Sequence, residues 1–302
     1  MSAAAIMMRV LCTVADTRRD RGLKTPADVR RFDRIRYGRD RRWNLMDIYR
    51  PKETKRMLPV IVSVHGGGYV YGGRKIYQHY CLYLAEQGFE VVNFDYRLAP
   101  ASHFPAPVED LNAVLKWISR YGSNYGMDRS HIFLVGDSAG AQIASQYAAM
   151  YANPAYRRMM AMKLPPVHIS ALGLNCGIYD LKGAQKLAKG QLSGLMDDYL
   201  TKDHRQWGKK LNVLDYITPA YPPVSLVSAP GDFLNKELGP MMEILERNHV
   251  RHTGRLYGTK ETQHVFHLDT RSALAREAIR DQLDFFRQVM AAEAGAAAGR
   301  AV

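Results

Sequence analysis

The chain has 302 residues, of which 47% are hydrophobic and 24% are charged, and it carries a formal net charge of +13. This is ordinary globular composition, and the length allows one large α/β domain with a sizeable core. No apolar run reaches the roughly 18 residues that a membrane-spanning helix needs. We therefore expect no transmembrane segment.

Residues 1–30 are predicted to be helical and peripheral. Met7, Val10, Leu11 and Val14 recur at the spacing that places side chains on one face of a helix. An arginine interrupts this apolar stretch and no basic residue precedes it, so the segment is a poor signal peptide. We expect this helical segment to belong to a cap over the main domain.

The pattern from residue 31 to residue 290 is that of strands alternating with helices. Two short alternating runs at 34–37 and 43–49 predict an antiparallel pair, and the continuous β-branched run at 58–64 predicts a buried strand. Further strands are expected at 90–94, 131–135, 167–174, 224–227 and 251–257, and helices at 76–86, 108–121, 139–151 and 271–290. Such alternation predicts an α/β domain at 31–290 with a mostly parallel eight-stranded sheet and helices on both faces. The Ala/Gly-rich residues 291–302 are expected to form a flexible tail.

Residues 180–215 interrupt this alternation, because no strand is predicted among them. An apolar stripe recurs there at helical spacing, formed by Leu192, Leu195, Met196, Tyr199 and Leu200. The stripe fits either an ordinary surface helix or a small cap laid across a pocket. Its position between two strands that lead to candidate catalytic residues favours the cap.

Much of the positive charge lies early in the chain. Residues 18–42 hold eleven Lys and Arg against four Asp, with Phe32, Tyr37 and Trp43 nearby. The stretch fits a phosphate-binding patch or a solvated Arg-rich start of the fold, and we favour the second interpretation. No nucleic-acid partner is expected. The stretch is also compatible with an anionic substrate or a membrane surface as its partner.

The three cysteines, Cys12, Cys81 and Cys176, are far apart and form no CxxC pair. This usage favours reduced, buried thiols and a cytoplasmic protein.

The string Gly136-Asp137-Ser138-Ala139-Gly140 follows an apolar run directly. A run of this kind before G-x-S-x-G predicts a strand, a sharp turn and a helix, with Ser138 at the turn. We expect that a side chain at Gly136 or Gly140 would strike the neighbouring strand or helix. The turn would hold the Ser138 hydroxyl where it can attack a carbonyl carbon.

A second glycine-rich string, His65-Gly66-Gly67-Gly68, follows the predicted strand at 58–64. Its backbone N–H groups would bind the oxyanion that forms when a serine attacks a carbonyl. Either string alone is a moderate signal, but both together, each after a strand, indicate a serine hydrolase.

A serine hydroxyl needs a basic histidine oriented by a carboxylate, and in sheet-based hydrolases the acid and then the histidine follow the serine. Asp232 fits the acid best, because it follows the predicted strand at 224–227 and the turn residues Pro230-Gly231. Asp180 also follows a strand and is the main competitor. The other candidates fall in the presumed cap and are expected to be solvated: Asp197, Asp198, Asp203 and Asp215.

His264 fits the base, because it lies between the last predicted strand and the final helix. His267 is its rival, whereas His249 and His252 fall at the start of that strand and therefore at the wrong end of the sheet. A metal site built on His264 and His267 lacks a third ligand nearby in sequence, and we discount it.

These strings together resemble the hormone-sensitive-lipase-like branch of the α/β-hydrolase fold, which includes many bacterial acetyl esterases and carboxylesterases. The resemblance covers about residues 58–283. The strings that carry it are HGGG at 65–68, DYRLAP at 95–100 with Phe104-Pro105-Ala106 after it, GDSAG at 136–140, Asp232-Phe233-Leu234 and His264-Val265-Phe266. By this similarity the triad would be Ser138, Asp232 and His264, and the oxyanion donors would be the N–H groups of Gly67, Gly68 and Ala139. The 95–100 string would be scaffold, and neither a metal nor a cofactor would be required.

Three positions depart from the family pattern and leave the shape of the substrate open: Ala101 replaces Glu, Val265 replaces Gly, and Phe233 replaces Pro. We expect a carboxylesterase that hydrolyses small-molecule short-acyl esters through an acyl-enzyme. Short acyl chains are expected because bulky side chains would fill the pocket, namely Tyr69, Tyr71, Tyr179 and Met196. The alternatives are an amide or formamide hydrolase, arylformamidase-like or peptidase-like, on the same triad, and a non-catalytic ligand-binding member of the fold. A homo-oligomer stays open.

Overall fold

The computed structural model describes residues 1–181, 191–201 and 204–298. In this part of the chain, eight strands form one sheet in the order β1-β2-β4-β3-β5-β6-β7-β8. The pairs β1–β2 and β2–β4 are antiparallel and all other neighbours are parallel. The strands are β1 (Val29–Arg36), β2 (Leu45–Pro51), β3 (Leu58–Val64), β4 (Glu90–Phe94), β5 (Met127–Asp137), β6 (Ile169–Asn175), β7 (Val224–Ser228) and β8 (His252–Leu256). The predicted α/β fold with a mostly parallel eight-stranded sheet is confirmed.

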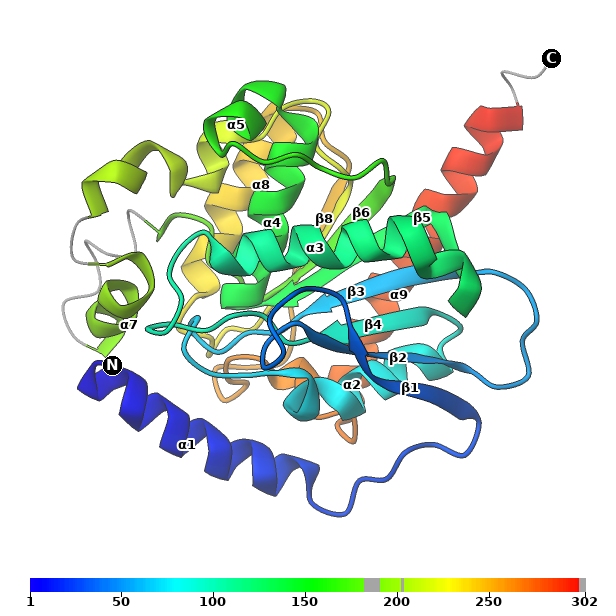
Figure 1. Ribbon diagram of the computed structural model, residues 1–302, viewed down its shortest axis with the longest axis horizontal. Coiled ribbons are helices and arrows are strands. Elements are labelled where there is room, and N and C mark those ends of the chain that lie inside the picture. The colour runs from blue at the N-terminus through cyan, green and yellow to red at the C-terminus, as the bar shows by residue number, and fades with distance from the viewer. Residues whose placement is uncertain (182–190, 202–203, 299–302) are drawn as a thin grey trace.

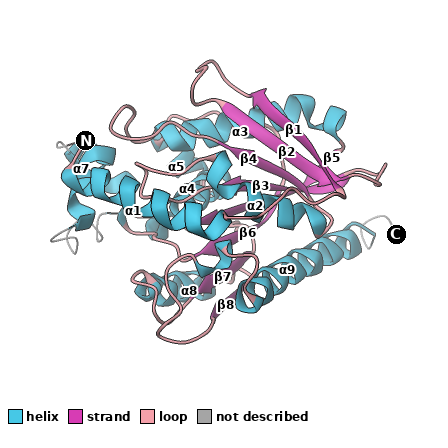
Figure 2. Cartoon of the chain, turned by 90° about the horizontal axis from the view of Figure 1, so that it is seen from below, coloured by secondary structure: helices cyan, strands magenta, loops and turns pink. Residues whose placement is uncertain are grey.

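Helices cover both faces of this sheet (Figures 1 and 2). Those described are α1 (Ala3–Asp20), α2 (Arg74–Glu86), α3 (Ala106–Tyr121), α4 (Ala139–Ala152), α5 (Pro154–Met159), α7 (Gln191–Leu200), α8 (Leu238–Arg247) and α9 (Ala273–Ala298). Within those residues, no helix is both long and apolar enough to cross a membrane.

The two faces of the sheet have separate cores, because successive side chains of a strand point to opposite faces. In β3, Val60 and Val62 join the core that α3 and α4 cover, whereas Ile61 joins the core that α2 and α9 cover. In β5, Leu134 joins the core under α3 and α4, and Phe133 joins the core under α2 and α9. Burial on both sides explains why these strands are continuous apolar runs rather than alternating ones.

The carboxyl ends of the central strands meet at one edge. Gly136 of β5 pairs with Val64 of β3, and Asp137 pairs with Asn175 of β6. Asn175 pairs in turn with Val227 of β7. The loops that follow β3, β5, β6 and β7 therefore start side by side, at the edge where ligands bind in open α/β sheets.

The N-terminal helix is shorter than predicted. It ends at Asp20, and β1 begins at Val29, so the helical segment does not extend to residue 30. Figure 1 shows α1 in blue along the outside of the molecule, with its N-terminal end beside α7. The backbone N–H of Ser2 donates to the Asp198 carboxylate of α7 at 2.7 Å. The face that carries Met7, Val10, Leu11 and Val14 is exposed to solvent rather than packed on the protein.

In the presumed cap, α7 buries Leu195, Met196, Tyr199 and Leu200 of the predicted stripe. The Tyr199 ring stacks on Tyr69, with ring centroids 3.7 Å apart. The stripe therefore anchors α7 to the main core. Residues 182–190 and 202–203 of the presumed cap, with the candidate Asp203, lie outside the described residues.

Two helices, α5 and α8, were not predicted, and the last helix is longer than predicted. The helix α8 has Pro240 in its first turn, where a proline removes no needed hydrogen bond. The last helix does not end at residue 290 but continues to Ala298. In this extension the Glu293 carboxylate lies 2.8 Å from His168 Nε2 and accepts a hydrogen bond from the Ser170 hydroxyl at 3.0 Å. Residues 299–302 of the predicted tail lie outside the described part.

Candidate active site

Ser138 lies at a tight turn between β5 and α4, and its backbone has φ +51° and ψ −118°. Few side-chain-bearing residues adopt a positive φ, and such strain is common at functional sites. A Cβ at Gly136 would collide with the backbone of Gly140, and one at Gly140 would collide with the Val64 carbonyl. The close approach of strand and helix expected from the sequence is therefore present.

A cavity of about 180 Å³ lies at this turn. Ser138 and His264 both line it, together with Gly66 and Gly67 from the loop after β3. The helix α1 also forms part of the wall, through Met8, Cys12, Ala15 and Asp16. The N-terminal helix is thus a wall of the cavity that contains the serine.

Asp232 and His264 form a hydrogen-bonded pair. His264 Nδ1 lies 2.7 Å from Asp232 Oδ1, and Asp232 is only 2% exposed. The Asp232 carboxylate also accepts from the Ser228 hydroxyl and from the Leu234 N–H, both at 2.9 Å. Burial alone would raise the pKa of Asp232, but the hydrogen bond and charge of His264 outweigh it and hold the pKa below its usual value. The carboxylate is therefore ionised and orients the imidazole.

Ser138 and His264 share the cavity without a hydrogen bond between them. Across the described ranges, the Ser138 hydroxyl makes no hydrogen bond at all. Catalytic hydrogen bonds are often long in unliganded enzymes and tighten when substrate binds. The arrangement leaves the hydroxyl open toward the cavity.

The rival residues lie elsewhere. His267 is 1% exposed, and neither ring nitrogen has a hydrogen-bond partner in the described structure. Burial lowers the pKa of His267 to about 3, so its ring is neutral. Asp180 forms a strand-like bridge to Asn212 at the base of the presumed cap. Among the candidate acids that the structure describes, Asp232 is the one hydrogen-bonded to His264.

The loop after β3 lines the same cavity as His264. The Gly66 N–H donates to the Tyr77 hydroxyl at 2.9 Å, and that hydroxyl donates to Asp137 Oδ2 at 2.8 Å. Gly67 lines the cavity with φ +107°, a region that favours glycine, and Gly68 follows it. Ala139 is the first residue of α4, where backbone N–H groups have no partner within the helix.

His65 supports this loop, is buried, and does not line the cavity of Ser138. Its ring stacks on Tyr96 with centroids 3.9 Å apart, and its Nδ1 lies 2.7 Å from the Gly66 carbonyl oxygen. Burial lowers the pKa of His65 to about 4. A neutral imidazole in this position fixes the loop without adding charge.

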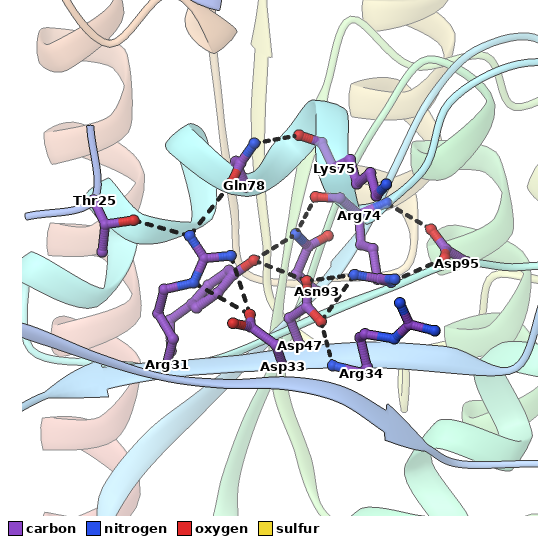
Figure 3. Close-up of polar contacts among 11 residues, drawn as sticks. Thr25, Arg31, Asp33, Arg34, Asp47, Arg74, Lys75, Gln78, Asn93 and Asp95 are labelled. Carbon is purple, nitrogen blue, oxygen red and sulfur yellow. Dashed lines mark hydrogen bonds and ion pairs between the residues drawn. The ribbon is translucent and has the colours of Figure 1, made fainter. Parts of the chain in front are cut away.

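A largely buried ion-pair network holds Arg74, the first residue of α2 (Figure 3). Arg74 donates to both oxygens of Asp47 at 2.9 and 3.0 Å, and to Asp95 Oδ2 at 3.0 Å. The Arg74 N–H also donates to Asp95 Oδ1 at 2.7 Å, and Asn93 donates to the Arg74 carbonyl at 2.8 Å. Asp95 begins the string that was expected to be scaffold, and its contacts agree with that role.

Cys176 is a neighbour of the acid that sequence reasoning did not single out. Its sulfur atom, an oxygen of the Asp232 carboxylate and a ring nitrogen of His264 all lie within 4.8 Å of one another. These residue types can ligate zinc, but burial raises the pKa of the thiol well above its usual value and keeps it protonated, which disfavours ligation. Its place directly after β6 is a signal that could have identified it.

The bulky side chains expected to fill the pocket are only partly involved. Tyr71 lines the cavity, and its hydroxyl donates to Asp16 at 2.8 Å. Tyr69, Tyr179 and Met196 are instead buried in the main core and are not among the residues that line the cavity. The residues of α1 take their place as its wall.

Comparison with known proteins agrees with this fold. A protein-family model described as BD-FAE matches residues 46–234. Carboxylesterase NlhH of Mycobacterium tuberculosis is 34% identical over 135 residues, covering 43% of this chain and 42% of that protein. Arylacetamide deacetylase of Bos taurus is 36% identical over 107 residues, covering 33% and 27% respectively. The matches thus span less than half the length of these curated relatives.

A solved structure covers far more of the chain. Esterase B of Lactobacillus rhamnosis, inhibited with a tributyrin phosphonate, superposes with a TM-score of 0.90 over 97% of this chain and 96% of that one, at 23% identity. A likeness at this identity establishes the fold, while the family model spans more than half of the sequence. This chain therefore belongs to the BD-FAE family and has an α/β-hydrolase fold of the hormone-sensitive-lipase-like kind.

Proposed function

We propose that this protein is a serine carboxylesterase that acts through an acyl-enzyme. The observation that carries the proposal is the common cavity of Ser138 and His264, with His264 Nδ1 2.7 Å from the buried Asp232 carboxylate. A hydroxyl on a strained turn, a nearby imidazole and a buried acid are the components of a catalytic triad. The esterase relatives support the same activity.

In the proposed reaction, His264 takes the Ser138 proton as the hydroxyl oxygen attacks the ester carbonyl. Asp232 orients the imidazole and stabilises its protonated form. The N–H groups of Gly67, Gly68 and Ala139 bind the oxyanion. The alcohol leaves with a proton from His264, and water then repeats the sequence to release the acid.

The cavity supports a small acyl group. Its volume of about 180 Å³ lies below the range of about 300–1,000 Å³ that is usual for drug-sized ligands. We therefore propose acetyl to butyryl esters as substrates, and the tributyrin phosphonate bound by Esterase B carries acyl chains of this length. Activity that rises steadily from acetyl to decanoyl esters would contradict this proposal.

We further propose that α1 and α7 together form the cap. Met8 of α1 and Leu195 of α7 both approach Gly68, and α1 walls the cavity. Substrate selection would then depend on the N-terminal helix as well as on the insertion between β6 and β7.

Amide hydrolysis on the same triad is the second candidate function. It is favoured by the match to arylacetamide deacetylase, whose name describes an acetamide substrate. Parallel assays on aryl acetates and aryl acetamides distinguish the two. A higher kcat/KM on the acetamide would make amide hydrolysis the main activity.

The nucleophile is tested by Ser138→Ala in an assay with p-nitrophenyl acetate. Removing a triad nucleophile typically lowers kcat by about 10,000-fold or more. Ser123→Ala is the matched control, because Ser123 is exposed and lies outside the cavity. Retention of most activity by Ser138→Ala would show that another residue attacks the ester.

A further inference from the structure

The helix α1 presents two chemically different faces. Its inner face lines the cavity through Met8, Cys12 and Asp16. Its outer face carries large apolar side chains that are between 41% and 61% exposed, namely Ile6, Met7, Val10, Leu11 and Val14. Scattered exposed apolar residues are normal, but a contiguous stripe on one helix face marks an interaction surface.

The polar groups within this outer face are satisfied by the helix itself. The Thr13 hydroxyl donates to the Arg9 carbonyl at 2.6 Å, and the Thr17 hydroxyl donates to the Thr13 carbonyl at 2.7 Å. Neither hydroxyl needs a hydrogen bond from solvent. The face can therefore enter an apolar environment at little cost.

Exposed cations flank the apolar stripe at both ends. Arg18, Arg21 and Lys24 are exposed at and just beyond the C-terminal end of α1. At the other end, the exposed Arg42 shares an open cavity of about 480 Å³ with Met1. These residues belong to the Arg-rich stretch that the proposed esterase reaction does not use.

The acidic groups of α1 face inward and are neutralised. Asp16 and Asp20 both pair with Arg19 at 2.7 Å, and Asp16 also accepts from the Tyr71 hydroxyl. The outer face is therefore apolar and positively charged without a competing exposed carboxylate on the helix.

We propose that the outer face of α1 docks on the surface of an anionic lipid bilayer. An apolar helix face flanked by basic residues lies in the headgroup region of such a bilayer, where both features are stabilised. Self-association through this face is disfavoured, because two chains with a net charge of +13 each repel one another. The bilayer supplies an apolar environment for the exposed apolar side chains and negative charge for the exposed cations.

Docking in this way goes beyond the proposed esterase reaction and does not depend on it. Because α1 also walls the cavity, a docked molecule would hold the site of Ser138 close to the lipid surface. Esters that partition into the headgroup region would then reach the site from a locally high concentration.

The proposal is tested by co-sedimentation with vesicles of phosphatidylcholine, with or without phosphatidylglycerol. The wild-type chain should bind the anionic vesicles and leave the neutral ones largely free, with binding that weakens as salt increases. The double substitution Val10→Gln/Leu11→Gln should lower the partition coefficient at least tenfold, because it removes the centre of the apolar stripe. Met57→Gln/Leu256→Gln is the matched control, since these side chains are 47% and 46% exposed elsewhere on the surface.

A second variant tests the charges. Arg18→Gln/Arg21→Gln should weaken binding by about fivefold for each charge removed and should reduce the salt dependence. All variants should hydrolyse p-nitrophenyl acetate like the wild type, because none of these side chains lines the cavity of Ser138. Activity on this soluble ester also reports that each variant is folded, and circular dichroism does so if the chain proves inactive.

Three results would overturn the proposal. They are equal binding to neutral and anionic vesicles, wild-type binding by Val10→Gln/Leu11→Gln, and absence of vesicle binding. If sedimentation equilibrium then shows a dimer that the Val10→Gln/Leu11→Gln variant lacks, the outer face of α1 binds a second copy of the chain instead.

Discussion

Two groups of residues at one cavity each contain a histidine and a buried carboxylate, and the pKa values of the two carboxylates are shifted in opposite directions. On one side, His264 lies 2.7 Å from Asp232, whose pKa is held below its usual value. On the other side, Asp137 has a pKa raised to about 7, because burial outweighs the hydrogen bond from Tyr77. His65, on this second side, has no carboxylate partner among the described residues: its Nδ1 lies 2.7 Å from the Gly66 carbonyl oxygen, and burial lowers its pKa to about 4.

The difference shows that the hydrogen-bond partners of a carboxylate or an imidazole, rather than its residue type, determine its role. A carboxylate that accepts several hydrogen bonds beside an imidazole stays charged and can stabilise an imidazolium. A carboxyl group with a single phenol partner is easily neutralised and serves to brace a loop. We therefore propose that the Asp232 side performs the chemistry, while the Asp137 side is scaffold for the loop of Gly66 and Gly67.

The largest expected difference is in kcat, when each of the two carboxylates is replaced by a neutral amide. Asp232→Asn should lower kcat by about 10,000-fold, because the amide cannot hold the productive tautomer of His264. Asp137→Asn should lower kcat by less than about tenfold, since an amide oxygen can still accept from Tyr77. Kinetics with p-nitrophenyl acetate measure both, and equal losses would erase the proposed division of roles.

The scaffold side should instead show its importance in stability. Arg74→Leu leaves Asp47 and Asp95 without their cation in a buried setting, and we expect a loss of about 3–5 kcal/mol in the free energy of unfolding. Urea denaturation measures this loss. The control is Arg271→Leu, which breaks an exposed pair with Asp269 and should cost about 1 kcal/mol or less. A small effect at Arg74 would show that the network is dispensable.

The smallest expected effect is on the pH dependence of the free energy of unfolding, to which the two carboxylates contribute differently. The pKa of Asp137 is raised in the folded state to about 7, so the folded chain retains a proton there that the unfolded chain has lost at lower pH. Stability should therefore fall as pH rises from about 4 to about 7, by at most about 1.4 kcal/mol per pH unit. Asp137→Asn removes this slope, so its stability relative to the wild type should improve as pH rises.

Asp232→Asn is the opposite case and serves as the control. The lowered pKa of Asp232 stabilises the fold above about pH 4, and this contribution is lost only as pH falls further. Between about pH 5 and pH 8, the Asp232 carboxyl itself therefore contributes no slope to the free energy of unfolding. A constant difference for Asp137→Asn as well would contradict the raised pKa.

The sheet and the position of the serine could be predicted because local patterns determine them. Continuous apolar runs such as residues 58–64 signal strands buried on both faces, and G-x-S-x-G after such a run signals the turn at Ser138. The choice of Asp232 and His264 followed from their position after strands. Carboxyl ends of parallel strands meet at one edge, so sequence order is sufficient to bring these residues together.

Other features depend on contacts between distant segments and could not be predicted. Periodicity indicated a helix at the N-terminus, but it could not show that the face of Val10 and Leu11 points to solvent while Met8 and Cys12 wall the cavity. The same holds for Cys176, whose contact with Asp232 is made across β6 and β7. The helix α8 was not predicted either, although its Pro240 lies in the first turn, where a helix tolerates proline.

The central claim is that Ser138 is a nucleophile activated from the Asp232 side of the cavity, and a fluorophosphonate probe with peptide mass spectrometry tests it most directly. We predict one phosphonyl group per chain, attached to the peptide that contains Ser138, with labelling that slows sharply in Asp232→Asn but not in Asp137→Asn. Label on another residue, or an unreactive Ser138 in the folded wild-type chain, would contradict the account.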